Sequence, residues 1–127
     1  MSLKSPLGRV LGLGAAGGSH HWWLQRLSSI ALVPLTAWFA IALLTLPNLA
    51  FATVHAWLAE PVSTVLLLLL VPTALHHSWL GVAVVVEDYV HAPLAKTLAL
   101  LFLQLLHVVV GAIALYAVLA IAFGAAP

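Results

Sequence analysis

The sequence contains three long apolar stretches, at about residues 27–46, 62–86 and 93–123. The first two carry no charged residue, and the third carries only Lys96. A helix needs about 20 residues to cross a hydrocarbon core of roughly 30 Å. Each stretch is long enough, so the sequence predicts an all-α membrane protein with three transmembrane helices.

The composition supports this fold class and excludes several others. The 127 residues are 65% apolar and 6% charged, and the mean hydropathy is +1.20, whereas soluble domains carry about 25% charged residues. A secreted, disordered, nucleic-acid-binding or ordinary cytosolic protein is therefore excluded. The chain has no cysteine, so any cofactor must be held by nitrogen or oxygen ligands.

The polar segments divide the chain. Residues 1–26 are predicted to form an N-terminal arm, and residues 27–127 a three-helix transmembrane anchor domain. Pro34 lies within the first span, where a proline can kink a helix without ending it. Residues 47–61 are predicted to form a loop, and the short link at 87–92 makes the second and third spans antiparallel neighbours.

The positive charges predict the orientation in the membrane. All four lie in the N-terminal segment or close to the second link, at Lys4, Arg9, Arg26 and Lys96. The first loop and the C-terminal tail carry none. Because cytoplasmic segments are enriched in Lys and Arg, we expect a multi-pass protein of the inner (cytoplasmic) membrane with a cytoplasmic N-terminus.

Three histidines, His76, His77 and His107, lie inside the predicted spans. His77 is 11 residues from Asp88, which places it roughly 16 Å from the cytoplasmic end of its helix. A neutral imidazole at that depth either ligates haem iron or forms a hydrogen bond between helices. Adjacent helical residues point about 100° apart, so at most one of His76 and His77 faces a single iron.

Four polar residues lie near the predicted cytoplasmic ends of the first two spans. Tyr89 can donate a hydrogen bond to a ligand carbonyl, with Asp88 in support. Alternatively, Tyr89 is only an interfacial anchor and Asp88 a solvated acid beside it. Arg26 can pair with a haem propionate or with Asp88, or acts only as a positive-inside anchor. His21 is a possible partner for a propionate or for water.

Two segments carry a family resemblance that covers nearly the whole chain. They are H-H-W-W-L-Q-R at 20–26 and H-x-W-L-G-x6-D-Y-V at 77–90. Together they resemble the hydrophobic membrane anchor subunit, or D subunit, of succinate dehydrogenase (complex II). The resemblance implies that the three helices form half of a heterodimeric anchor bundle with a second membrane anchor subunit, the C subunit.

The resemblance also implies the roles of individual residues. His77, the histidine 11 residues before the Asp-Tyr pair, corresponds to the axial ligand of haem b, and the second ligand comes from the partner anchor subunit. Tyr89 corresponds to the residue that hydrogen-bonds ubiquinone, with Asp88 supporting that site. Arg26 is expected near the quinone and the haem propionates, and His21 matches the His-Trp position of the family.

The implied activity belongs to a complex and not to this chain alone. Succinate would be oxidised in the flavoprotein subunit, and electrons would pass through the iron–sulfur subunit to ubiquinone at a site shared with both anchors. Two alternatives remain open at the level of the residues. One is a haem-free membrane scaffold or assembly protein, and the other is a haem b subunit of another membrane oxidoreductase, with His77 and His107 as both ligands.

Overall fold

The computed structural model describes residues 15–124 of the backbone, with the side chains of residue 20 and residues 22–124. This part of the chain forms four helices and no strand: α2 (Ala15–Thr45), α3 (Phe51–Ala59), α4 (Pro61–Tyr89) and α5 (Pro93–Ala122). Helices α2, α4 and α5 are long and apolar enough to cross a membrane. The prediction of an all-α protein with three transmembrane helices is confirmed.

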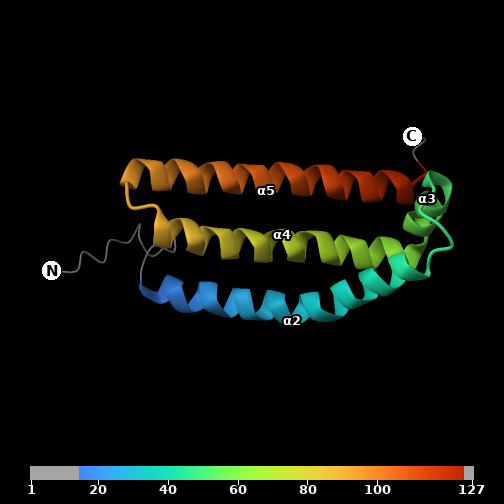
Figure 1. Cartoon of the computed structure of the whole chain (residues 1–127), viewed down its shortest axis with the longest axis horizontal. Coiled ribbons are helices and arrows are strands. Elements are labelled where there is room, and N and C mark those ends of the chain that lie inside the picture. Colours follow the sequence, from blue (N-terminus) through green and yellow to red (C-terminus); the bar gives the residue numbers. More distant parts are fainter. Residues whose placement is uncertain (1–14, 125–127) are drawn as a thin grey trace.

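Helix α4 is the central element (Figure 1). It packs against α2 on one side and against α5 on the other, while the backbones of α2 and α5 do not approach each other closely within the described residues. The three long helices run antiparallel in sequence order, and the short α3 contacts α4 and α5 at the end opposite the α4–α5 link. The order of packing is therefore α2, α4, α5.

Prolines explain two of the breaks between helices. Glu60 and Ala92 each precede a proline, and a residue in that position is disfavoured from helical geometry. Both are extended, Glu60 with φ −66° and ψ 133° and Ala92 with φ −69° and ψ 120°. Pro61 and Pro93 then begin α4 and α5, where the missing N–H costs no intrahelical hydrogen bond.

Two predicted boundaries are wrong. The segment 47–61 was expected to be a loop but contains α3. The link was expected at 87–92, but α4 continues through Tyr89, leaving only residues 90–92 outside the helices. The Val90 N–H donates to the Val86 carbonyl at 2.9 Å. The Lys96 ammonium donates to the Glu87 carbonyl at 2.8 Å, a favourable position for a cation at a helix C-terminus.

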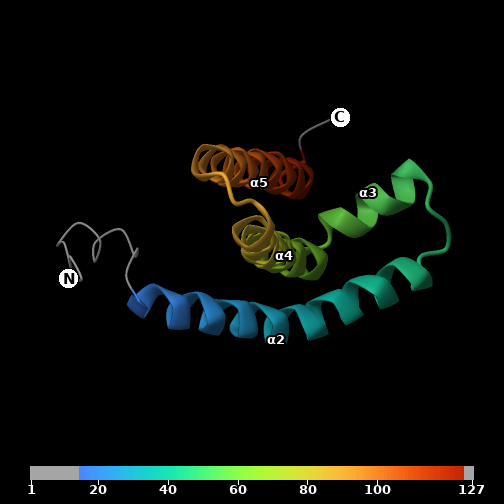
Figure 2. The ribbon, with the colours of Figure 1, turned by 60° about the vertical axis from the view of Figure 1, so that its left-hand side comes forward.

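Both internal prolines are accommodated within continuous helices. Pro34 lies inside α2 and Pro72 lies inside α4. Figure 2 shows α2 as one long curved ribbon, as expected for a single span that contains a proline. The first span also extends further than predicted, because α2 already begins at Ala15.

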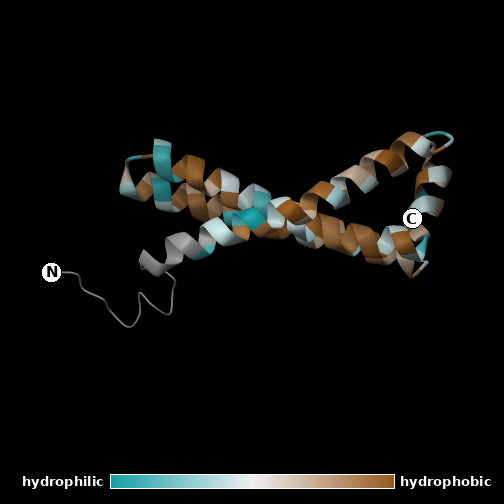
Figure 3. Cartoon of the chain, turned by 90° about the horizontal axis from the view of Figure 1, so that it is seen from below, coloured by the Kyte–Doolittle hydropathy of each residue, from teal (hydrophilic) through white to brown (hydrophobic). Residues whose placement is uncertain are grey.

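The protein core is small and concentrated toward the α3 end. Leu67 and Leu70 of α4 are buried with Val118 of α5. The Trp38 ring of α2 stacks on Trp57 of α3 with centroids 6.0 Å apart. Most other large apolar side chains are exposed, and Figure 3 shows hydrophobic residues along all three long helices. Lipid or partner helices must therefore cover most of this chain.

Candidate functional site

The candidate site begins with a hydrogen bond that joins α2 to α4. His77 Nδ1 lies 3.0 Å from Ser28 Oγ, and the Ser28 hydroxyl donates to the Gln25 carbonyl at 2.9 Å. A hydroxyl has a single hydrogen to donate, so with that hydrogen directed to Gln25 the Ser28 oxygen can accept from a protonated Nδ1 of His77. This pairing favours the neutral tautomer of His77 that leaves Nε2 unprotonated. Nε2 makes no hydrogen bond within the described part of the chain.

Small and polar groups surround this contact. Gly81 lies one turn along α4 from His77, and a β-carbon there would be 3.7 Å from the Gln25 amide nitrogen. The Gln25 side-chain oxygen is buried and has no hydrogen-bond partner among the described residues. The α2–α4 interface near His77 thus combines an uncrowded backbone with an acceptor that another group can satisfy.

The two adjacent histidines diverge as predicted from helix geometry. His77 contacts α2 through Ser28. His76 is exposed and lines an open cavity of about 550 Å³ between α4 and α5. His76 is therefore on the other side of α4, and only His77 belongs to the α2–α4 site.

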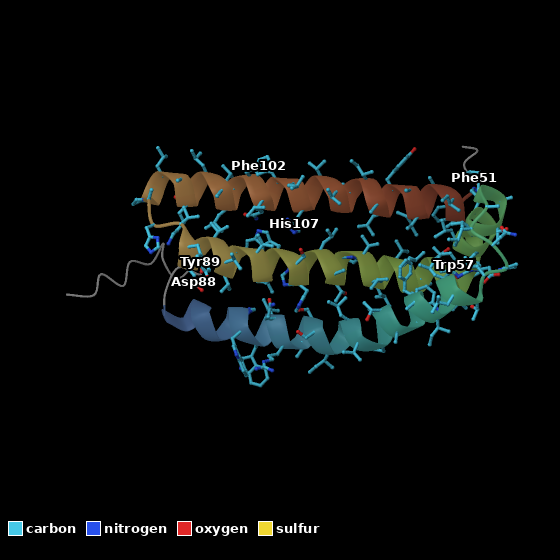
Figure 4. The ribbon with its side chains drawn as sticks, in the orientation of Figure 1. Phe51, Trp57, Asp88, Tyr89, Phe102 and His107 are labelled. Atoms are coloured by element: carbon cyan, nitrogen blue, oxygen red, sulfur yellow. The ribbon has the colours of Figure 1, made fainter. Side chains whose placement is uncertain are left out.

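His107 has a different set of contacts. Its Nδ1 donates to the Leu103 carbonyl at 2.8 Å, and its Nε2 accepts from the Ser78 hydroxyl at 3.3 Å. Figure 4 shows His107 between α5 and α4, away from the α2–α4 contact. Both ring nitrogens are occupied, so the geometry does not support the alternative in which His77 and His107 ligate one iron.

No larger metal centre is present in the part of the chain that the structure covers. No group of three or more His, Cys, Asp or Glu side chains there could hold a metal ion.

Asp88 and Tyr89 occupy the last turn of α4 (Figure 4). Both are exposed, and 79% of Tyr89 is accessible. The His91 Nδ1–H donates to the Tyr89 carbonyl at 3.1 Å, which ties the start of the link to this turn. The phenol and the carboxylate are therefore presented together at the end of the helix where the N-terminal half of α2 also lies.

Arg26 does not form the ion pair with Asp88 that was one expectation. Its guanidinium lies over the Trp22 ring, 5.1 Å from the centroid, and the side chain is exposed. A cation in this position gains from the ring quadrupole while it remains open to an anion. The predicted site residue His21 lies on α2, but its side chain is outside the described part of the structure.

Sequence reasoning did not assign Ser28 and Gln25 to the site. Ser28 is 49 residues from His77, so no local spacing connects the two. The available signal was a buried hydroxyl inside an otherwise apolar span, because polar groups at membrane depth require partners. That signal does not reveal which partner the hydroxyl takes.

Fold and site together define a class: a small multi-span membrane subunit with most of its apolar surface uncovered and one interhelical imidazole with a free nitrogen. Residues 1–121 match the family described as "Succinate dehydrogenase/Fumarate reductase transmembrane subunit". The chain belongs to this family, as a hydrophobic membrane anchor subunit of succinate dehydrogenase. It is thus part of an oxidoreductase complex.

Individual relatives agree with the family match. The succinate dehydrogenase hydrophobic membrane anchor subunit of Rickettsia conorii is 35% identical over 96 residues, covering 75% of this chain and 76% of the relative. The subunit from Rickettsia felis is 36% identical over 92 residues, covering 72% and 77%. The subunit from Rickettsia bellii is 40% identical over 76 residues, covering 60% and 61%. No solved structure matches the chain.

Proposed function

We propose that this anchor subunit binds haem b through His77 Nε2, jointly with the second anchor subunit, and contributes Tyr89, Asp88 and Arg26 to a ubiquinone-reducing site. One observation carries the proposal: the hydrogen bond from His77 Nδ1 to Ser28 Oγ. It supports the tautomer in which Nε2 has a lone pair. A neutral imidazole held in this way is the usual axial ligand of haem iron.

The residues at the site fit a haem ligated from two chains. His77 is the histidine at the α2–α4 interface, since His76 lines the cavity on the α5 side and both nitrogens of His107 have partners. A second ligand would then come from another subunit. Gly81 offers a position without a side chain one turn away. When bound, haem supplies reversible one-electron chemistry.

The quinone part of the proposal depends on the end of α4. The exposed Tyr89 phenol is suited to donate a hydrogen bond to a quinone carbonyl, whose oxygen gains negative charge on reduction. The Asp88 carboxylate beside it can accept and pass on protons from the aqueous side. Arg26, with no carboxylate partner in the described residues, is suited to grip a propionate. His21 is included by family resemblance alone.

Orientation and partners complete the proposal. Lys96 lies in the first turn of α5 beside the α4–α5 link and Arg26 lies in the N-terminal half of α2, whereas Glu60 lies between α3 and α4 at the opposite end of the bundle. The positive-inside rule then favours a cytoplasmic N-terminus in the inner membrane. At that face, Tyr89 is within reach of the iron–sulfur subunit, which would receive electrons from the flavoprotein subunit. The second anchor subunit would cover the free side of α2 and α4.

A reduced-minus-oxidised spectrum of the purified complex tests haem binding. We expect a b-type band in the parent complex and its loss or shift in His77→Ala. The matched controls are His76→Ala and His107→Ala, which should keep the band because neither side chain belongs to the α2–α4 site. Loss of the band in His107→Ala alone would contradict the ligand assignment. Absence of a band in the parent would support the haem-free scaffold.

A second experiment tests the quinone role of Tyr89. Tyr89→Phe removes only the phenolic hydroxyl. We expect slower ubiquinone reduction, with succinate oxidation by an artificial acceptor unchanged, because the flavoprotein reaction lies in another subunit. Equal loss in both assays would mean that Tyr89 acts on assembly and not on the quinone.

A further inference from the structure

We infer that Ser28 is the positioning residue for His77: its Oγ accepts the Nδ1–H hydrogen bond that fixes the ring's tautomer and tunes its strength as a haem ligand. The inference rests on the proposed ligation of haem by His77. It concerns a residue of α2 that itself makes no contact with iron. Its consequence is a reduction potential that depends on one hydroxyl group.

The hydrogen bonds at Ser28 form a directed chain. His77 Nδ1 donates to Ser28 Oγ at 3.0 Å, and Ser28 Oγ donates to the Gln25 carbonyl at 2.9 Å. With the Ser28 hydrogen directed to the Gln25 carbonyl, the lone pairs of Oγ are available to the imidazole.

Burial makes this acceptor hard to replace. Ser28 is 8% exposed, and His77 lies 12 residues from the end of α4, roughly 18 Å along the helix axis. A polar hydrogen at that depth has no bulk water as an alternative partner. Without Ser28 Oγ, the His77 Nδ1–H would remain unpaired, or the ring would change its tautomer or orientation.

The hydrogen bond also changes the chemistry of Nε2. An imidazole that donates from its far nitrogen is a more basic ligand, and such supporting groups typically alter metal affinity or activity 10- to 100-fold. A more basic axial ligand favours ferric over ferrous iron and lowers the haem potential. Removing the acceptor should therefore raise the potential.

Ser29 provides a matched control on the same helix. Its hydroxyl donates to the same Gln25 carbonyl, at 2.7 Å, but makes no hydrogen bond to His77. Ser29→Ala therefore removes a hydroxyl from the same turn of α2 as Ser28, and this hydroxyl donates to the same acceptor, the Gln25 carbonyl. Any general effect of losing a serine hydroxyl from α2 appears in both variants, and only the effect on the ligand differs.

The experiment is an optically monitored redox titration of the haem in the intact complex, for the parent, Ser28→Ala, Ser28→Thr and Ser29→Ala. We expect Ser28→Ala to raise the potential. A tenfold loss of preference for ferric haem corresponds to about 59 mV for one electron. Ser28→Thr keeps the hydroxyl and should restore the parent value, and Ser29→Ala should match the parent.

The outcomes separate this inference from the proposal beneath it. A parent complex without a b-type haem, or a His77→Ala complex that retains it, refutes the haem proposal. A haem that depends on His77 but has the same potential in Ser28→Ala and the parent refutes only the role of Ser28. Equal shifts in Ser28→Ala and Ser29→Ala refute it as well. If Ser28→Ala yields no complex, Ser28→Cys, with a weak acceptor of similar size, carries the same expected shift.

Discussion

A valine at position 111 would test the close approach of α5 to α4. Gly111 is buried, and a β-carbon there would lie 3.1 Å from Leu75 Cδ1, a few tenths of an ångström inside ordinary contact. Glycines at helix interfaces in membranes permit such close packing. Valine adds two methyl groups at Cβ, and its stiff χ1 limits their escape from the contact.

The expected magnitude follows from two opposed effects. Overpacking a well-packed contact costs about 1–3 kcal/mol, while valine gains roughly 0.3 kcal/mol over glycine in helix propensity. Gly111→Val should then lower the free energy of unfolding by about 0.7–2.7 kcal/mol. In Gly111→Ala the smaller overlap is offset by a propensity gain of about 1 kcal/mol, so we expect little change.

The assay is equilibrium unfolding of the purified subunit in mixed micelles of increasing SDS content, followed by tryptophan fluorescence. Ala117→Val, at an exposed position of α5, is the control and should stay within about 0.5 kcal/mol of the parent. Adding Leu75→Ala to Gly111→Val removes the clashing methyl and should recover part of the loss, as a coupling of about 0.5 kcal/mol or more. Equal destabilisation by both valines, or no coupling to Leu75, would refute the reasoning.

Three further predictions concern other contacts. Lys96→Ala removes the ammonium from the Glu87 carbonyl and should lower the local stability of the last turn of α4 by about 0.3–1 kcal/mol. Amide hydrogen exchange should become faster in that turn only, and unchanged exchange there would contradict the prediction. Trp57→Ala ends the stacking on Trp38 and should lower unfolding stability by more than the pair's own 0.5–1.5 kcal/mol or so, whereas a neutral result would mean that α3 is not fixed by this pair. Gly81→Ala meets only an ordinary contact at 3.7 Å, so unfolding stability should hold or rise by up to about 1 kcal/mol; a marked loss in the same micelle assay would show that this position is tighter than described.

The long helices were predictable because hydropathy over 20 or more residues is a strong signal. The short α3 was not, because Phe51–Ala59 is too short to span a membrane and its mixture of apolar and weakly polar residues fits a loop equally well. The end of α4 was placed too early because Glu87 and Asp88 look like link residues. In the structure they are helical, and the Glu87 carbonyl accepts a hydrogen bond from Lys96 of the following helix.

The candidate site was predictable in part. The divergence of His76 and His77 follows from helix geometry alone, and the structure agrees with it. The contact between His77 and Ser28 was not predictable, because Ser28 is distant in sequence and reaches the ring only because α2 packs on α4. The position of the Arg26 side chain over Trp22 was likewise not predictable, because counting charges does not show whether a guanidinium will lie on a nearby ring or pair with a carboxylate.

The central position of α4 places the α4–α5 cavity and the His77–Ser28 contact on different sides of one helix. A substitution among the cavity residues therefore changes side chains that do not form the His77–Ser28 contact. The α5 half can therefore adapt to a different lipid or a different neighbour in the membrane while the ligand geometry of His77 is preserved. Divergence among such subunits should accumulate faster on α5 than on the face of α4 that meets α2.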